Sequence, residues 1–282
     1  MKKLQSIIYV FIPILLIVSG WVIFNKYIRP NHYQLLFPYS AFQFRNEALT
    51  QSRIGSDDRV QILIPEGKTI VGKDDYAETE SVDEYWIDQI PVTVKAYKDF
   101  LKDNPSLLEP RYVDEYYKYW VQKEYELLPV VFVSWGQAED YCEYYGGHLP
   151  TEIQWEKAAR GPEGILLYWD DSKKAFDRAN YDNFFGGKTL SGWLPRGRTI
   201  YGAIDMSGNV REWTMEWVFD FGQPVYTGEW EDLRVIHEGT LGRMLKGGSY
   251  ADDVSHLRLN YRDAHDPNSP GLNRGFRCVY EK

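Results

Sequence analysis

The stretch MLKGGSYADDVSHLRLNYRDAHDPNSPGLNRGFRCVY, residues 244–280, opens close to a glycine pair and closes close to a cysteine. Gly247 and Gly248 permit positive φ angles and close backbone approach, so the chain can turn sharply at this point. Apolar and polar side chains alternate over residues 256–262, which predicts a strand with one packed and one polar face. A second strand is predicted over residues 275–280, after a loop rich in Pro and Asn.

The composition is that of a globular, aromatic-rich protein. Of the 282 residues, 44% are hydrophobic and 16% are aromatic, which is ample for a sizeable core. The formal net charge of -9 argues against a nucleic-acid partner, because binding phosphates needs a basic stripe. Ten Trp and 22 Tyr suit a fold with little regular structure, in which large side chains pin the loops.

An uncharged apolar run lies near the N-terminus. Residues 7–24, IIYVFIPILLIVSGWVIF, are flanked by lysines on one side and by Lys26 and Arg29 on the other. About 20 apolar residues cross a bilayer, so the run predicts a transmembrane anchor within residues 1–29. A cleaved signal peptide is the competing interpretation.

Either interpretation exports the rest of the chain. We expect a single-pass protein of a bacterial inner membrane, held by its N-terminal helix, with the C-terminal domain in the periplasm. Residues 30–59 have mixed polarity and are expected to form a linker or collar. The domain itself is expected over residues 60–282.

The sequence has only two cysteines, Cys142 and Cys278. An even pair in an exported domain is a disulfide candidate, and two buried free thiols are the alternative. A bridge would close a loop of roughly 140 residues, to which the chain-entropy model assigns about 4 to 5 kcal/mol.

Local patterns predict short elements. Thr151 and Gln154 have the spacing of a capping box at the start of a helix, in which each side chain satisfies the other's backbone amide. The other predicted elements are two strands around a Pro-Glu-Gly turn over residues 60–75, a strand over 85–88 with a broken continuation over 90–93, helices over 94–102 and 136–145, loop over 161–202, and a turn leading into a strand over 204–217.

Residues 103–128 form an insertion dense in Tyr, Glu and Lys. We expect it to be helical at least over residues 113–125. The simplest interpretation is a solvated helix lying on the body of the domain. A partner-binding surface is the alternative, because exposed Tyr and Trp suit interfaces.

Five stretches in order resemble the formylglycine-generating enzyme and sulfatase-modifying-factor family. They are IPEGKTIVGKDD, YWIDQIPVTVKAYKDF, LPVVFVSWGQAEDYCEYYGGHLPTEIQWEKAARG, YGAIDMSGNVREWTMEW, and LKGGSYADD followed by NRGFRC. The resemblance covers residues 60–282. It implies a single α+β domain related to C-type lectins, with sparse regular structure and long ordered loops.

The departures from the family pattern bear on activity. The family's copper-dependent enzymes oxidise a substrate cysteine to formylglycine with two cysteines that follow the GGSY element, and here those positions are Asp252 and Leu257. Soft Cu(I) selects thiolates, which neither residue supplies, so we expect no copper. By resemblance, Cys142 and Cys278 match positions that form a disulfide in some relatives.

The family also binds calcium, and the resemblance implies one site in the turn DMSGNVRE. The expected ligands are the side chains of Asp205 and Glu212 and the carbonyls of Gly208 and Val210, which are hard oxygen donors. The alternative is structural, with Asp205 and Asn209 capping the turn.

Ligand binding is expected in a groove around Trp86, Asp252, His256 and Arg258. The weaker alternative is a metal site built from His256, His265 and the acidic residues Asp252, Asp253 and Asp263. Two His and one carboxylate suffice to bind non-haem iron. The alternative is weaker because the two His lack the spacing that would place them on one face of a helix. A solvated polar rim explains the same residues.

Two functional hypotheses follow. The first is a membrane-anchored, non-catalytic member of the family that binds a periplasmic protein or peptide as an accessory to maturation or assembly. The second is an enzyme of altered chemistry, an oxidoreductase-type maturation factor like the family members associated with siderophore chromophores, in which the cysteines are also missing.

Overall fold

The computed structural model describes residues 51–72, 77–110, 112, 116–219 and 241–282. The predicted anchor, and most of the predicted linker, lie outside these residues. None of the helices in the described ranges combines the length and the apolar character that a membrane span needs.

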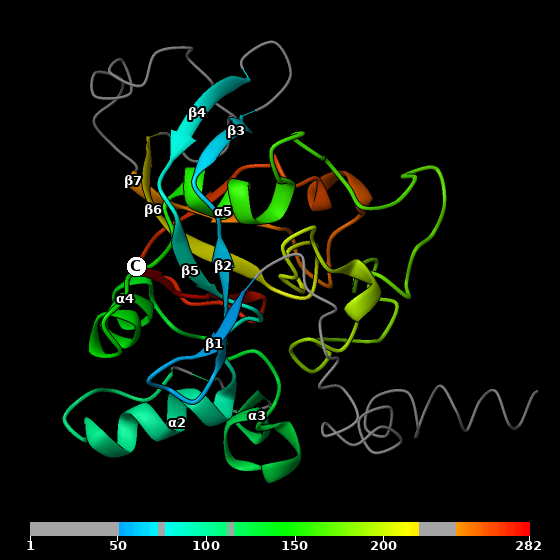
Figure 1. The fold of residues 1–282 in the computed structure, drawn as a ribbon. Helices are drawn as coiled ribbons and strands as arrows, with labels where there is room; N and C mark the ends of the chain where they lie inside the picture. Colours follow the sequence, from blue (N-terminus) through cyan, green and yellow to red (C-terminus); the bar gives the residue numbers. More distant parts are fainter. Residues whose placement is uncertain (1–50, 73–76, 111, 113–115, 220–240) are drawn as a thin grey trace, which may run out of the picture.

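The described strands form three sheets (Figure 1). All neighbouring strands are antiparallel except β6 and β9, which are parallel. The first sheet has the order β1 (Ser52–Ile54), β2 (Val60–Ile64), β5 (Tyr85–Asp88), β10 (Val279–Glu281). The second pairs β3 (Gly67–Val71) with β4 (Glu78–Val82), and the third has the order β8 (Asp263–His265), β7 (Leu241–Lys246), β6 (Arg211–Phe219), β9 (Arg274–Gly275).

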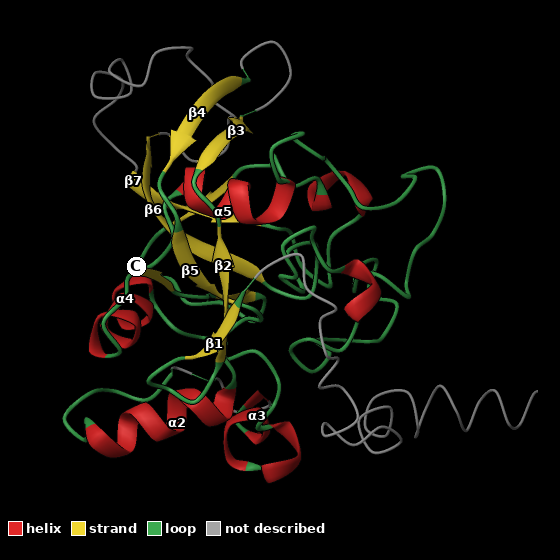
Figure 2. Ribbon diagram, viewed as in Figure 1, coloured by secondary structure: helices red, strands yellow, loops and turns green. Residues whose placement is uncertain are grey.

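Short helices cover the sheets. The α-helices are α2 (Val94–Asp103), α3 (Lys118–Val121), α4 (Trp135–Tyr144) and α5 (Glu152–Arg160), and the 3-10 helices are η5 (Lys123–Tyr125), η6 (Pro195–Gly197) and η8 (Val254–Leu257). Helices α2, α3 and α4 lie at one end of the molecule, whereas α5 lies at the other end beside the β3–β4 ribbon (Figure 1). Long loops make up much of the rest (Figure 2). The domain therefore mixes helix and sheet, in agreement with the predicted α+β class.

Several local predictions are confirmed. Helix α2 begins after Thr93, whose side chain accepts a hydrogen bond from the Ala96 amide, and it covers the predicted range. The capping box of Thr151 and Gln154 is present at the start of α5. Helix α4 buries Cys142, as its spacing predicts. The pattern of each helix is set by residues three or four apart, which is why the sequence is sufficient there.

The predicted strand over residues 256–262 is wrong. The chain forms η8 and then a series of turns, in which the amides of His256 and Tyr261 donate to the carbonyls of Asp253 and Arg258. Local bonds thus satisfy the backbone without a partner strand. The alternation correctly indicates burial at one apolar position, since Leu257 is fully buried.

Four other predictions differ from the structure. The predicted strand over residues 275–280 is formed only at its ends, because β9 ends at Gly275 and β10 begins at Val279. This run is buried on both faces, since Arg277 is fully buried beside its apolar neighbours. Residues 90–93 are not a strand, although Thr93 forms an isolated bridge with Pro129. The insertion has α3 and η5 where a longer helix was predicted, and residues 113–115 lie outside the described part. The first sheet already includes β1, ahead of the predicted domain boundary at residue 60.

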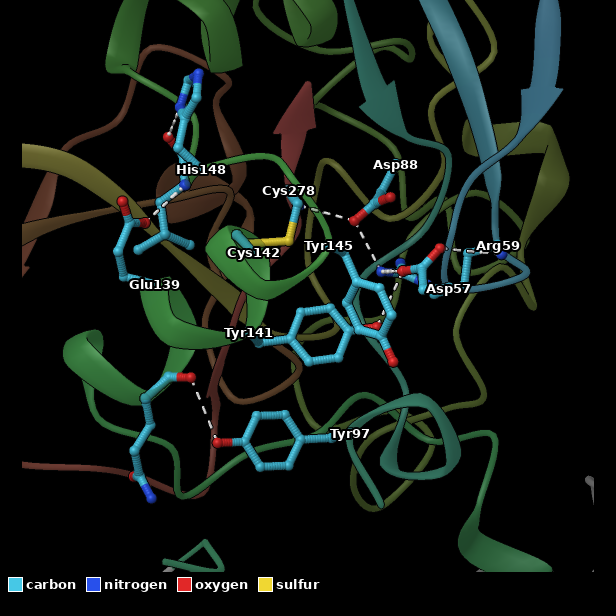
Figure 3. The surroundings of a disulfide bond; sticks show 12 residues. Asp57, Arg59, Asp88, Tyr97, Glu139, Tyr141, Cys142, Tyr145, His148 and Cys278 are labelled. Carbon is cyan, nitrogen blue, oxygen red and sulfur yellow. Dashed lines mark hydrogen bonds and ion pairs between the residues drawn. A yellow bond between two sulfur atoms is a disulfide. The ribbon is translucent and has the colours of Figure 1, made fainter. Parts of the chain in front are cut away.

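The two cysteines are joined as a disulfide at the centre of the fold (Figure 3). Cys142 comes from α4, and Cys278 directly precedes β10. Asp88 accepts a hydrogen bond from the Cys278 amide at 2.8 Å and from Nη1 of Arg59 at 2.7 Å. Burial raises the pKa of Asp88 to about 6, although Arg59 opposes that shift. The bridge therefore joins the middle of the domain to its end within a buried polar and aromatic environment.

Removing the disulfide should lower the melting temperature by several degrees. The bridged residues are 136 positions apart in sequence, and a closed loop of that length is worth about 4 to 5 kcal/mol in the chain-entropy model. For a domain of this size each kcal/mol shifts the melting temperature by about 2 to 4 °C. Thermal melts of the native protein with and without reductant, and of the Cys142→Ala/Cys278→Ala variant, measure the effect. Equal melting temperatures, or free thiols that titrate in the native protein, would contradict it.

Candidate functional site

A glycine pair shapes the loop that follows β7. Gly247 and Gly248 have φ angles of 89° and 67°. A Cβ atom on Gly248 would lie 2.7 Å from the carbonyl oxygen of His256, and one on Gly247 would lie 2.9 Å from that of Met206. Both positions therefore require glycine, and the predicted sharp turn is confirmed.

Asp252 is the centre of a polar cluster beyond this turn. Its Oδ2 accepts hydrogen bonds from the amide and the hydroxyl of Ser249, at 2.8 and 2.7 Å, and its Oδ1 accepts one from Nη2 of Arg211 at 2.7 Å. Nη1 of Arg211 lies 3.1 Å from Oδ2 of Asp263, and Nδ2 of Asn273 donates to the Ser249 hydroxyl at 3.1 Å. We call Arg211, Ser249, Asp252, Asp263 and Asn273 the Asp252 cluster.

The third sheet positions the charged members of the Asp252 cluster. Arg211 begins β6 and is in parallel register with Arg274 of β9. Asp263 begins β8, at the other edge of the same sheet. The pKa of Arg274 is lowered by burial and by the neighbouring Arg211, with Asp263 opposing the shift. The cluster therefore holds one guanidinium group and two carboxylates, with the guanidinium of Arg274 beside it.

Leu257 lies in a different environment from Asp252. It is fully buried and packs in a hydrophobic cluster with Ala179 and Tyr181, with Val254 against it. An apolar side chain in such a cluster offers no ligand atom. The two positions that correspond by resemblance to the family's thiols thus hold an ion-paired carboxylate and a core leucine.

His256 and Arg258 line an exposed rim next to this loop. Nδ1 of His256 lies 2.9 Å from Oδ1 of Asp253, and its ring contacts that of Tyr261. Hydrogen bonds from Ser255 first, and then from His256, lower the pKa of Asp253 to about 2. Arg258 pairs with Asp171 at 2.9 Å. Both pairs are exposed, and such surface ion pairs contribute little to stability.

Trp86 does not join these residues. It lies on β5 in the hydrophobic cluster that contains the disulfide, and the guanidinium of Arg53 lies 4.5 Å from the centre of its ring. In the described ranges no hydrogen bond, ion pair or ring contact connects Trp86 with Asp252, His256 or Arg258. Strand β5 thus places Trp86 in the core, apart from the contacts of the other three residues, and ligand binding by the four together stays a prediction.

The predicted calcium ligands lie in the turn before β6 and at its start. Asp205 is buried with a φ angle of 61°, and its Oδ2 accepts hydrogen bonds from the Gly192 amide and from Asn209. Burial raises the pKa of Asp205 to about 6. Gly208 has a φ angle of 84°, and a Cβ there would lie 2.3 Å from the carbonyl oxygen of Asn180. Val210 is fully buried.

Glu212 does not fit a calcium site in this arrangement. Its two carboxylate oxygens accept hydrogen bonds from Nε and Nη2 of Arg277, both at 2.7 Å, and Oε2 also accepts one from Trp155 at 2.8 Å. A cation would have to displace the Arg277 guanidinium, which itself is fully buried. Calcium bound by Asp205 and the carbonyls of Gly208 and Val210 stays a prediction, whereas the predicted fourth ligand, Glu212, is already engaged by Arg277 and Trp155.

The alternative metal site is not assembled either. Within the residues that the structure describes, no group of three or more His, Cys, Asp or Glu side chains could hold a metal ion. Asp252 is held by Arg211, and His256 is paired with Asp253. The residues proposed for that site are thus distributed over separate ion pairs.

Tyrosines of the insertion lie beside the Asp252 cluster. Burial raises the pKa of Tyr250 to about 12, and Tyr116, Tyr119 and Asp252 add to the shift. Tyr116 packs in a cluster with Phe132 and Val210, and the ring of Tyr119 contacts that of Tyr125. The insertion therefore contributes residues that lie beside the candidate site, and it also exposes residues at the surface.

Sequence reasoning missed several of these residues. Asp263 was named only as a candidate metal ligand, and its ion pair with Arg211 has no local signal, because that pairing depends on the order of the strands in the third sheet. Arg277 lies in the RGFRC motif, but nothing local indicates its buried pair with Glu212. The many tyrosines of the insertion did indicate a candidate binding surface in the sequence. The sequence alone could not show which residues they pack against.

Comparisons with known proteins find the same family along most of the chain. The model of the sulfatase-modifying factor enzyme 1-like domain matches residues 47–282. The serine/threonine-protein kinase pkn1 of Chlamydia pneumoniae is 34% identical over 160 residues, which are 56% of this chain and 25% of that protein. The inactive C-alpha-formylglycine-generating enzyme 2 of Mus musculus is 32% identical over 170 residues, which are 54% of this chain and 49% of that protein.

A solved structure shares the fold. The structure of PvdO from Pseudomonas aeruginosa matches with a TM-score of 0.64 and 19% identity, covering 82% of this chain and 98% of that one. At this identity the likeness concerns the fold alone. The chain spans between a quarter and about half of the length of the two curated relatives described above.

Breaking the Arg277–Glu212 pair should be strongly destabilising. The Glu212→Gln change leaves the buried guanidinium without its counter-charge, which costs about 3 to 5 kcal/mol. Urea denaturation at neutral pH measures the loss. The matched control is Glu281→Gln, since the Glu281 side chain is 70% exposed, and it should change stability by less than about 0.5 kcal/mol. Similar losses for both variants would contradict the central role of the pair.

Proposed function

Because the chain belongs to the sulfatase-modifying factor enzyme 1-like family, we propose that it is an exported, membrane-anchored member that binds a protein or peptide partner and makes no formylglycine by the copper route. The observation that carries the proposal is that the chain has no free thiol. The sequence has two cysteines, and they are bonded to each other. No thiolate is left for a soft copper ion, which selects such ligands.

The loop after the glycine pair supports the same conclusion. Both carboxylate oxygens of Asp252 are engaged by Ser249 and Arg211. Leu257 belongs to a hydrophobic cluster. The loop is thus held in shape by ion pairing and packing. One relative is named as an inactive formylglycine-generating enzyme. This supports a family in which some members keep the fold without the enzymatic activity.

Features of the surface support a binding role. The insertion exposes apolar side chains, with Leu108 68%, Val121 51% and Tyr117 46% exposed. Trp120, in contrast, is buried, so it is not part of this surface. Exposed aromatic and aliphatic side chains suit protein interfaces, which have an apolar centre and a polar rim.

The proposed location rests on two features. Residues 7–24 have the length and the apolar character of a membrane span. The disulfide is typical of proteins that fold outside the reducing cytosol. An inner-membrane anchor with the domain in the periplasm accounts for both. Calcium in the turn before β6 remains part of the proposal only without Glu212 as a ligand.

The purified protein should neither bind stoichiometric copper nor convert cysteine to formylglycine. Cu(I) titration in the presence of a competing chelator measures binding, and mass spectrometry of a CxPxR peptide measures conversion. A formylglycine-generating enzyme assayed in parallel controls for the peptide and the oxygen supply. One equivalent of bound copper together with conversion would overturn the proposal.

Changes in the insertion should weaken partner capture more than changes in the loop. The variants are Tyr117→Ala and Val121→Asp in the insertion, and Asp252→Ala and His256→Ala in the loop. Affinity capture of the full chain from its own membranes measures binding by the amount of one specific co-purified protein. Leu166→Asp is the matched control, because this apolar side chain is 36% exposed on another loop.

The opposite pattern would favour the alternative hypothesis. An enzyme of altered chemistry, an oxidoreductase-type maturation factor, should lose its cellular function when Asp252 or His256 is changed. It should tolerate the insertion variants. Thermal melts of each variant separate loss of function from loss of fold.

A further inference from the structure

Exposed apolar side chains lie along helix α4. Leu107 and Leu108, which belong to the insertion, are 37% and 68% exposed, and Tyr144 is 46% exposed. Nε2 of Gln137 donates to the Leu108 carbonyl at 3.0 Å, and the Tyr144 hydroxyl donates to Oδ2 of Asp103 at 3.3 Å. The segment that follows α2 thus runs beside α4, from its last turn toward its first turn, and it carries the two leucines there.

The solvent face of α4 itself is acidic. Its exposed positions are Gly136, Asp140, Glu143 and Tyr144, which are three or four residues apart and therefore lie on one side of the helix. The helix contains three acidic residues and no Lys or Arg. In the described part of the chain, no Lys, Arg or His forms an ion pair with Asp140 or Glu143. The negative charge of this face is therefore not neutralised from within the described chain.

The cations of the neighbouring helix α2 are already engaged. Lys95 and Lys102 both pair with Asp99, at 2.6 and 2.5 Å. Asp103, at the end of α2, is exposed and adds a further carboxylate beside α4. The resulting surface has an apolar centre and an acidic margin, and we call it the α4 surface. Its residues are Asp103, Leu107, Leu108, Asp140, Glu143 and Tyr144.

The core holds the α4 surface in place. A capping box begins α4, and the disulfide joins Cys142 of this helix to Cys278 (Figure 3). The ring of Tyr141 stacks on that of Tyr97 from α2, with the ring centres 5.7 Å apart. The two helices therefore form one preorganised support. A preorganised surface loses little conformational entropy when a partner binds, which favours affinity.

We propose that the α4 surface docks a basic, apolar segment of the partner protein. Apolar side chains of that segment pack on Leu108 and Tyr144, and its Lys or Arg side chains lie against Asp140 and Glu143. Charge selects this occupant, because the exposed carboxylates attract a basic segment and repel an acidic segment, an anionic lipid headgroup or a second copy of the same surface. The inference rests on the proposed partner role and adds the chemistry of the partner.

Site-specific photocrosslinking tests the proposal. The photoreactive residue p-benzoylphenylalanine replaces Leu108 in the full chain, and in the matched control it replaces Leu166, which is 36% exposed on another loop. The probes are an amphipathic peptide of Leu and Lys and its counterpart with Glu in place of Lys. The Leu/Lys peptide should crosslink at position 108 at least about tenfold more than at position 166, and about tenfold more than the Leu/Glu peptide, because the carboxylates attract one peptide and repel the other.

Salt and charge reversal separate this docking from unspecific apolar adsorption. The yield at position 108 should fall at least about fivefold between about 0.05 M and about 0.5 M salt, because salt screens exposed charges. In the same crosslinking chain, Asp140→Lys and Glu143→Lys should each lower the yield at least about threefold with an unchanged melting temperature. Asp177→Lys is the control, since this carboxylate is 55% exposed on another loop, and it should leave the yield unchanged.

Equal crosslinking of the two peptides at position 108, or a yield that neither charge reversal lowers, would overturn the inference. A chain-to-chain adduct or a lipid adduct in place of the peptide adduct would also overturn it, because either would identify a different occupant. The partner role is tested separately, by the dependence of capture on Tyr117 and Val121. Failure of the inference and failure of the proposed function are therefore distinguishable.

Discussion

The buried pair of Arg277 and Glu212 is the interaction on which the rest of this fold depends. Arg277 has five N–H donors, and each is matched: three bonds go to the carbonyls of Asp88, Gln89 and Ile204, and two go to Glu212. These acceptors come from β5, the residue after it, a loop and β6. A buried charge is tolerated only when it is paired and hydrogen-bonded in this way. One side chain thereby fixes the relative positions of two sheets in a domain with long loops.

A second buried network does the same for α5. Lys246 of β7 pairs with Glu152 and Glu156, Arg262 donates two hydrogen bonds to Glu152, and Arg160 pairs with Glu156. Charged groups inside a protein specify one arrangement, because any other arrangement leaves a charge without its partner. Where regular structure is sparse, such networks and the aromatic packing supply the specificity that long helices and wide sheets supply elsewhere.

The sequence was informative wherever the interaction is local. Residues three or four apart decide a capping box or a buried helix face, so α2, α4 and the start of α5 could be predicted. Prediction failed where a distant partner decides. Glu212 was expected to be a calcium ligand, but Arg277, 65 positions away, pairs with it in the core. The alternation over residues 256–262 described burial and not strand pairing. For the candidate site, the special positions Asp252 and Leu257 were found by resemblance, whereas the pairing of Arg211 with Asp252 and Asp263 required the fold.

The loop after the glycine pair keeps its shape through restraints within the loop and its immediate neighbours. In this chain three hydrogen bonds to the Asp252 side chain restrain the same loop, and the amide of Asp182 donates to the Asp252 carbonyl as well. Leu257 anchors the far end of the loop through apolar packing. Because both restraints are internal, the outer face of the loop can change without loss of fold. New binding or new chemistry is therefore expected along that face, where the insertion meets the loop.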